Sequence, residues 1–449
     1  MSVLKSYNPA TGELLGDVPV ATEEEIKSVV AKAHQAQKAW GALDIDQRID
    51  ILTKAGAELQ KESQKIAVLL SREMGKDFRR SYGVVAGSAG SISYVAGTVK
   101  EAVQPVAVYG GQATIEYNPI GVCAIISPWN YPVSMAHWML IPALTAGNAV
   151  VLKPSEETPL VALAYVNVLN RVLPEGVLQI VFGDEEQGKM LVKSDVQLIG
   201  FTGSMEAGQD IMSSAGRGLK QVIMELGGKD PCIVLDDADL DEAVSFAVAN
   251  SLENAGQMCI STERVFVESS IYDEFVAKAC QYIRYFRVGP FTDQMANVGP
   301  IINEHQRQRI LDQIDDAVSR GAKIVAGGAP HPDHFINPTI LVDVTDDMDI
   351  AKYETFGPVV CITKFDDVED AIFSANNTDF GLGAVVYGDY GAEEVASRLE
   401  AGMVGINTGA GGGGDTPWVG AKMSGVGYHG SPDGHRQFTQ AKVVNRARW

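Results

Sequence analysis

The chain has 449 residues, of which 46% are hydrophobic and 21% charged, and its formal net charge is −21. This composition is typical of a globular protein with two or three domains and a core that needs no disulfides. The negative charge argues against nucleic acid and anionic membranes as partners, because both bind basic surfaces. Five scattered cysteines, no secretory leader pattern and no apolar run of about 18 residues predict a soluble, cytoplasmic protein.

The first third of the chain predicts helices and then strands. Thr22 and Glu25 form a capping-box pattern ahead of apolar residues at helical spacing, and a second amphipathic helix is expected from about Asp46 to Met74. Residues 112–127 predict two strands on either side of an Asn-Pro turn. We interpret this pair of strands as a hairpin.

Strands and helices alternate from there on, which predicts a doubly wound parallel sheet in an α/β protein. Expected strands cover residues 147–155, 176–184, 196–204 and 219–235, and expected helices cover 158–172, 187–194, 205–216 and 239–252. A second alternating set, from 264 to 328, suggests a second α/β domain. Residues 434–449 end in a strand-like segment with no partner nearby in the sequence, and such a tail often joins the sheet of another subunit.

Cys259 differs from the other four cysteines in its surroundings. It follows an apolar helix and precedes Ser261 and Thr262 in "ENAGQMCISTER", whereas the others lie in apolar runs, where a free cysteine acts as a small hydrophobe. This small, polar setting is typical of a reactive thiol. The four others are Cys123, Cys232, Cys280 and Cys361.

Polar segments follow three expected strands, where an open α/β sheet forms its ligand crevice. They are "SPWNYP" (127–132), "LKPSE" (152–156) and "FTGS" (201–204). The last leads into a helix whose N-terminus could face a phosphate, although the spacing of Gly203 and Gly208 does not match the usual dinucleotide fingerprint.

Six motifs in this order resemble the aldehyde dehydrogenase superfamily: "PWNYP", "LKPSEETP", "FTGS", "MELGGKDP", "NAGQMC" and "ETFGPVV". The resemblance runs from residues 7–13 to residues 423–430. It implies an NAD-binding domain made of residues 1–107 and 122–226, and a catalytic domain of residues 227–420. It also implies an oligomerisation element made of residues 108–121 and 430–449, and hence a homodimer or homotetramer.

The resemblance assigns catalytic roles that suit the side chains. Cys259 matches the nucleophile, since a thiolate adds to an aldehyde and the resulting thiohemiacetal can lose a hydride to give a thioester. Glu225 matches the general base that activates water to cleave the thioester. Asn130 matches the donor that, with the backbone N–H of Cys259, holds the developing oxyanion.

The same resemblance implies a nicotinamide cofactor. Lys153 and Glu156 would meet the adenosine ribose, and the carboxylate would repel a 2′-phosphate, which favours NAD over NADP. The pyrophosphate would lie near Thr202, Gly203 and Ser204, and the nicotinamide riboside near Glu354 and Phe356. Further contacts with the cofactor are expected from Ser127, Trp129, Ser155, Gly183 and Leu226. No metal is expected, because "HPDH" (331–334) has no third ligand nearby.

The sequence departs from the family around the substrate. "PWVG" (417–420) replaces the common "PFGG", and the preceding loop (408–416) is rich in glycine. Trp138 and Glu253 stand where succinate-semialdehyde dehydrogenases carry arginines. We therefore expect an uncharged aliphatic or a cationic amino aldehyde as substrate, attracted through Glu253 and Trp138.

Other functions remain open at this point. Succinate-semialdehyde oxidation is the nearest alternative. A coenzyme A-acylating dehydrogenase is disfavoured, because a hydrolytic base at Glu225 would work against it. A thiol hydrolase without cofactor and a catalytically inactive structural protein on the same fold are the alternatives of other classes.

Overall fold

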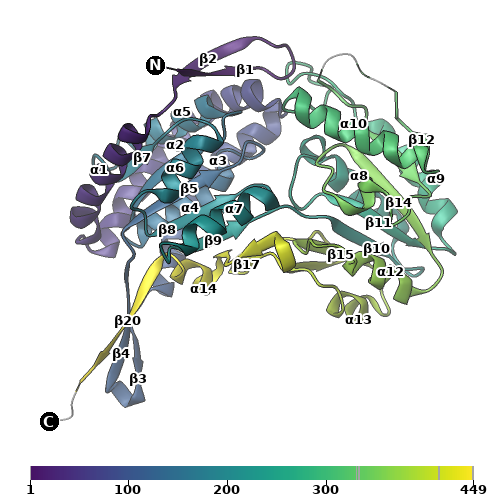
Figure 1. The fold of residues 1–449 in the computed structure, drawn as a ribbon. Coiled ribbons are helices and arrows are strands. Elements are labelled where there is room, and N and C mark those ends of the chain that lie inside the picture. The colour runs from purple at the N-terminus through teal and green to yellow at the C-terminus, as the bar shows by residue number, and fades with distance from the viewer. Residues whose placement is uncertain (1, 330, 332–333, 413–414, 447–449) are drawn as a thin grey trace.

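The computed structural model describes residues 2–329, 331, 334–412 and 415–446. The chain forms two α/β lobes and a narrow arm of three strands that projects from the first lobe (Figure 1). Both lobes contain a largely parallel sheet, which confirms the expected fold class. Within the described ranges, no helix is both long and apolar enough to cross a membrane.

The first lobe is built on a six-stranded sheet with the order β18-β9-β8-β5-β6-β7. Five of these strands are parallel, and β18 runs antiparallel to β9. The strands β5, β6 and β8 are buried along their whole length, which explains their continuous apolar sequences. The bounds are β5 Val122–Ser127, β6 Ala149–Pro154, β7 Leu178–Ile180, β8 Leu198–Thr202, β9 Gln221–Glu225 and β18 Gly425–Val426.

Seven helices cover this sheet in the described part of the chain. The capping box at Thr22 and Glu25 is present, and the long helix predicted from Asp46 is α2. A hairpin of β1 (Val3–Tyr7) and β2 (Leu14–Pro19) precedes them. The helices are α1 Glu23–Gly41, α2 Ile45–Met74, α3 Phe78–Ala102, α4 Ser134–Thr145, α5 Pro159–Leu169, α6 Glu185–Lys193 and α7 Met205–Gly216.

The second lobe contains a seven-stranded sheet with the order β12-β13-β14-β11-β10-β15-β16. Only β12 is antiparallel to its neighbour. The strands are β10 Asp230–Val234, β11 Thr262–Glu268, β12 Lys323–Ala326, β13 Thr339–Val342, β14 Val359–Phe365, β15 Gly383–Tyr387 and β16 Met403–Ile406. The helices are α8 Leu240–Leu252, α9 Tyr272–Tyr282, α10 Glu304–Ser319, α11 Asp349–Lys352, α12 Val368–Asn376 and α13 Ala392–Ser397.

The C-terminal segment returns to the first lobe. It contains β17 (Pro417–Trp418), which pairs with β19 (His429–Gly430), and the short helix α14 (Ser431–Arg436). Four single-turn 3₁₀ helices complete the described elements: Tyr109–Gly111, Glu253–Gly256, Ile283–Tyr285 and Lys422–Ser424.

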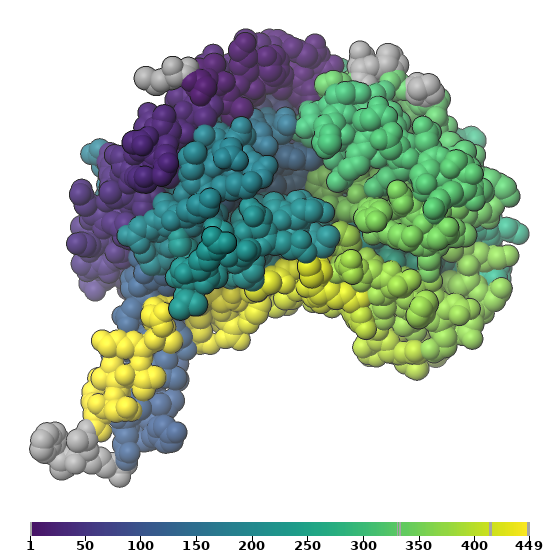
Figure 2. Space-filling view, viewed as in Figure 1, coloured from purple at the N-terminus to yellow at the C-terminus, as the bar shows by residue number. Residues whose placement is uncertain are grey.

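The arm corrects one expectation about strand pairing. It consists of β3 (Val106–Val108), β4 (Ala113–Pro119) and β20 (Thr439–Asn445), in the order β20-β4-β3. The expected hairpin of 112–127 is wrong, because β4 joins this arm while β5 enters the large sheet. The C-terminal strand has a partner far away in its own sequence, β4, and its other edge is at the end of this sheet. Figure 2 shows the arm standing clear of both lobes.

Candidate active site

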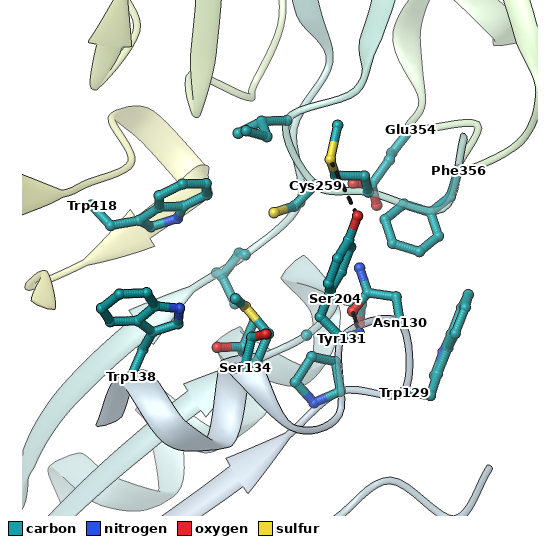
Figure 3. A pocket seen from close by; sticks show the side chains of 18 of the residues that line it. Trp129, Asn130, Tyr131, Ser134, Trp138, Ser204, Cys259, Glu354, Phe356 and Trp418 are labelled. Carbon is teal, nitrogen blue, oxygen red and sulfur yellow. Dashed lines mark hydrogen bonds between the residues drawn. The ribbon is translucent and has the colours of Figure 1, made fainter. Parts of the chain in front are cut away.

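A cavity of about 410 Å³ lies between the two lobes, and Cys259 is on its wall. The first lobe contributes the segment after β5 and the start of α4, and the second contributes the Cys259 loop and the segment 354–356. In Figure 3, Cys259 lies between Trp138 and Trp418 on one side and Trp129 and Phe356 on the other. The cavity therefore has one aromatic wall on each side of the thiol.

The Cys259 loop owes its shape to three successive left-handed residues. Asn254, Ala255 and Gly256 have φ angles of 54°, 59° and 72°. A Cβ atom on Gly256 would lie 2.0 Å from the carbonyl oxygen of Gly357, so only glycine fits there. The motifs "NAGQMC" and "ETFGP" thus pack backbone against backbone, which fixes the thiol relative to the segment 354–357.

Asn130 is buried beside this loop and is bound to it. Its Nδ2 atom donates a hydrogen bond to the carbonyl oxygen of Gln257 at 3.0 Å, and its Oδ1 atom accepts from the backbone N–H of Tyr131 at 3.0 Å. Nδ2 carries two hydrogens, and one of them remains for another acceptor. Asn130 also lines the cavity that contains Cys259, as an oxyanion donor must.

The surroundings of Cys259 keep its thiol protonated in the absence of ligands. Burial raises the pKa of Cys259, and the nearby carboxylates of Glu225, Glu354 and Asp230 raise it further. Cys123, Cys232 and Cys361 are fully buried in the core, as their apolar sequences predicted, whereas Cys280 is partly exposed. Cys259 is therefore the cysteine with a cavity and charged groups around it, but its neighbours do not activate it.

Glu225 stands at the end of β9, close enough to affect the thiol, but it does not line the cavity wall. It is only 4% exposed. Its one ion-pair partner among the described residues is Nε2 of His429, which is in close contact with Oε1. The sequence analysis did not single out His429, although it lies in the quoted segment 423–430.

A second cavity of about 540 Å³ continues from the first, sharing Trp129 and the turn at 202–204. It ends at the N-terminus of α7, whose first backbone N–H groups have no helical partners and could receive a pyrophosphate. The hydroxyl of Ser127 is buried and has no hydrogen-bond partner within the described part of the chain. The groove therefore fits a dinucleotide. The expected residues on its wall are Ser127, Trp129, Lys153, Ser155, Glu156, Thr202, Gly203 and Ser204.

Glu354 and Phe356 lie at the inner end of this path, beside Cys259. Burial and the nearby charge of Glu263 raise the pKa of Glu354 to about 8, although the backbone N–H of Gly228 donates to its Oε1 at 3.1 Å. The rings of Phe356 and Trp129 meet edge to face at 5.5 Å. Leu226 lines the same cavity.

Two residues that the sequence analysis missed hold this segment in place. The Glu263 carboxylate accepts from the backbone N–H groups of Thr355 and Phe356, and Nζ of Lys229 forms an ion pair with it. Nζ of Lys229 also donates to Oγ1 of Thr355 at 3.1 Å. Lys229 is in the quoted "MELGGKDP", but no signal links it to a glutamate of the next strand.

Two expected site residues lie away from both cavities. Gly183 lines neither cavity and has a φ of 148° in the turn before α6, directly before Asp184 and Glu185 on the wall of the groove. Glu253 lines neither cavity, and its Oε2 atom is 2.8 Å from Nε of Arg80. The expected direct contact of a cationic substrate with Glu253 is therefore not supported, because Glu253 faces Arg80 and not the cavity. Trp138 does line the cavity and is 38% exposed.

The wall also includes residues to which the sequence analysis assigned no role in the site. Arg309 is the only lysine or arginine among the described lining residues. Its guanidinium donates a hydrogen bond to the carbonyl oxygen of Thr355 at 3.5 Å, so it lies on the part of the wall that carries Glu354. The others are Val84, Tyr131, Ser134, Met135, Met258, Ile260, Gln306 and Trp418.

Behind the wall, Lys76 is buried 3.1 Å from the centre of the Tyr131 ring, and burial lowers its pKa to about 7. Its Nζ atom donates to the carbonyl oxygen of Asn130 at 3.3 Å, so this lysine supports the backbone of Asn130.

Among the described residues, no group of His, Cys, Asp and Glu is suited to a metal. Pro332 and Asp333 of "HPDH", Gly413 and Gly414 of the glycine-rich loop, and residues 447–449 lie outside the described residues.

The comparisons with known proteins agree with this geometry. The model of the aldehyde dehydrogenase family matches residues 2–444. The structure of succinate-semialdehyde dehydrogenase from Burkholderia pseudomallei is 37% identical, with 99% of this chain and 94% of that chain covered and a TM-score of 0.95. An NADP-dependent enzyme from E. coli is 36% identical over 99% and 94% of the two chains, also with a TM-score of 0.95.

A third structure, betaine aldehyde dehydrogenase from Staphylococcus aureus in complex with NAD+, is 29% identical over 99% of this chain and 91% of that chain, with a TM-score of 0.94. Cys259 lies in a cavity that continues into a groove fit for a dinucleotide, and the family model matches almost the whole chain, so the chain belongs to the aldehyde dehydrogenase family.

Proposed function

We propose that this enzyme oxidises an uncharged aliphatic aldehyde to the free carboxylic acid, with NAD as the hydride acceptor. The observation that carries the proposal is the shared cavity of Cys259 and Asn130, which continues into the groove that ends at α7. An aldehyde on the side of Trp138 and Trp418 and a nicotinamide on the side of Phe356 would meet at the thiol of Cys259.

The residues have distinct roles in this proposal. Sγ of Cys259, once deprotonated, adds to the carbonyl carbon, and the free N–H of the Asn130 amide stabilises the oxygen anion of the thiohemiacetal. A bound nicotinamide supplies a positively charged hydride acceptor, next to which the thiol ionises more readily. Loss of the hydride leaves a thioester on Cys259. Glu225 then takes a proton from water, whose oxygen attacks the thioester, and the acid and the free thiol are released.

The lining of the cavity supports an uncharged substrate. Trp138, Trp418 and apolar side chains form the side away from the cofactor groove, and Arg309 lies on the other side, near Glu354. A succinate semialdehyde would therefore place its carboxylate on an apolar surface without a cation, which costs free energy. An amino aldehyde could place its ammonium group on the Trp138 face, but it would not contact Glu253, which lies outside the cavity and is paired with Arg80.

The preference for NAD rests on Glu156 in the groove. Its side chain is 45% exposed, and its Oε2 atom is 3.8 Å from Nζ of the buried Lys153. A carboxylate here can accept hydrogen bonds from ribose hydroxyls and repels a 2′-phosphate. The similar enzymes include one that depends on NADP and one solved with NAD+. The preference for one cofactor must therefore be argued from the residues of each chain, not from the fold.

The deciding experiment measures kcat/KM for butyraldehyde, 4-aminobutyraldehyde and succinate semialdehyde with NAD and with NADP, read from the absorbance of the reduced cofactor. We expect butyraldehyde with NAD to give the highest value. Glu156→Ser should narrow the gap between the cofactors about tenfold, because one like-charge repulsion is removed. A preference for succinate semialdehyde, or for NADP, would contradict the corresponding part of the proposal.

A further inference from the structure

His429 and Glu225 form a buried pair at the side of the active site. Both are 4% exposed, and Nε2 of His429 is in close contact with Oε1 of Glu225. No hydrogen bond from another described residue holds this carboxylate, since neither Oε1 nor Oε2 of Glu225 has a hydrogen-bond partner within the described part of the chain. His429 is therefore the one described side chain that is paired with Glu225.

The fold gives the pair a fixed position. β18 lies against β9 with Gly425 opposite Glu225, which places the following residues next to the base. His429 is then anchored on β19, opposite Trp418 of β17. Its ring lies at an interplanar angle of 12° to Trp138, with 6.3 Å between the ring centroids. His429 thus contacts the base and both tryptophan-bearing elements of the cavity wall.

Few other charged groups face His429. From α14, His435 lies nearby, and burial lowers its pKa to about 4, so it is neutral at neutral pH. Its Nε2 atom bonds to Thr98 of α3 at 3.0 Å, and Asp415 acts on it from the preceding loop. Within the described residues, Nδ1 of His429 has no hydrogen-bond partner. Glu225 is therefore the group on which His429 acts most directly.

We propose that His429 is the positioning residue for the general base: it holds Glu225 by Oε1 and leaves Oε2 to take the proton from the attacking water. This inference rests on the proposed role of Glu225 in hydrolysis of the thioester. Because His429 acts through Glu225, it should affect deacylation and leave acylation of Cys259 almost unchanged. A base displaced by about 1 Å loses much of its effect, on the order of a hundredfold in rate.

The test measures acylation and deacylation separately. p-Nitrophenyl acetate acylates Cys259 without any cofactor, and the acetyl-enzyme can be followed by intact-protein mass spectrometry. We expect His429→Ala to slow deacylation about a hundredfold with acylation unchanged. His429→Gln, which keeps an N–H donor near the Nε2 position, should recover part of the rate. His435→Gln is the matched control, since it removes a neighbouring buried imidazole that does not contact Glu225.

A double-mutant cycle decides whether the effect passes through the base. In a Glu225→Gln background, His429→Ala should slow deacylation no further, because the two residues act as a unit. The inference is overturned if His429→Ala deacylates at the native rate, or if the full loss persists in the Glu225→Gln background. Failure of the proposed function would give a different result, because the native protein would then reduce neither NAD nor NADP with any aldehyde. The ester assay would still measure the effect of His429 on Glu225.

Discussion

Cys259 is surrounded by groups that oppose its ionisation, and this bears directly on its reactivity before ligands bind. Burial and three carboxylates raise the pKa of the thiol. At neutral pH the thiolate fraction is then small, and it increases as the pH rises towards that raised pKa. The sequence predicted which cysteine is special, but not this electrostatic restraint, because Glu225, Glu354 and Asp230 come together only in the fold.

Replacing Glu225 by Gln should therefore change two rates in opposite directions. Removing one negative charge lowers the pKa of Cys259, so alkylation by iodoacetamide at neutral pH should become several-fold faster in the cofactor-free protein. Deacylation should become about a hundredfold slower or more, because the base for water is lost. Peptide mass spectrometry of Cys259, with Cys280 as the internal reference, gives the first rate. Slower alkylation would instead mean that Glu225 deprotonates the thiol itself.

Glu253 provides a second test at the residue scale. Since Glu253 lies outside the cavity and is paired with Arg80, Glu253→Gln should change the ratio of kcat/KM for butyraldehyde and succinate semialdehyde by less than about twofold. Arg80 keeps its other partner, Asp77, at 3.1 Å. Trp138→Leu is the contrasting variant, because Trp138 lines the cavity and its loss should alter the ranking of aldehydes by chain length. A large gain for succinate semialdehyde in Glu253→Gln would show that the released Arg80 reaches the substrate.

At the scale of elements, most of the alternating strands and helices could be predicted, because buried parallel strands have continuous apolar sequences. Helix α3 and the pairing of β4 with β20 were not predicted, and each has a physical reason. Helix α3 (Phe78–Ala102) contains Gly83, Gly87, Gly90 and Gly97, which lower helix propensity and hide its periodicity. The pairing of β4 with β20 was invisible, because local sequence gives no information on a partner at the other end of the chain.

The same limit applies to the site. Cys259 and Asn130 were found through short motifs, and the structure places them in one cavity. The contacts of Glu263 with the segment 354–356 and of His429 with Glu225 join residues far apart in sequence. No pattern within a single element indicates such pairs.

The backbone packing of the Cys259 loop leads to a prediction for that element. Gly256→Ala would place a Cβ atom against the Gly357 carbonyl in a left-handed conformation, so we expect a loss of about 2 kcal/mol in unfolding free energy and more than tenfold in kcat. Gly90→Ala is the matched control, since that glycine faces open space on α3 and should stabilise the protein by about 0.5–1 kcal/mol. Denaturant unfolding and steady-state kinetics test both. Native-like activity in Gly256→Ala would refute the stated role of the loop.

At the scale of the whole molecule, the three-stranded arm is the part that packs least against the rest of its own chain. Three strands project from the first lobe (Figure 2). Val106 and Val443 on these strands, and Tyr109 in the turn between β3 and β4, are exposed. A small exposed sheet is marginally stable on its own, and β20 presents a free edge to another chain. We therefore predict a homodimer or homotetramer in which the arm contacts a second subunit.

Light scattering tests this prediction directly. The native protein should have a mass at least twice that of the 48.0 kDa chain. Val443→Lys should shift the equilibrium towards smaller species, because it places a charge on the apolar face of the arm. Lys5→Glu, on the N-terminal hairpin of the opposite part of the lobe, is the control and should leave the mass unchanged. A native monomer would contradict the prediction.

The route of the chain also makes three distant features depend on one stretch of sequence. β18 takes its place beside β9, His429 reaches Glu225, and β20 closes the arm, all from Gly425 onwards. A proteolytic cut just before Gly425 that released this stretch would leave Glu225 without its paired histidine and the arm one strand short. The active-site cavity and the proposed contact between subunits would thus be damaged by the same cut.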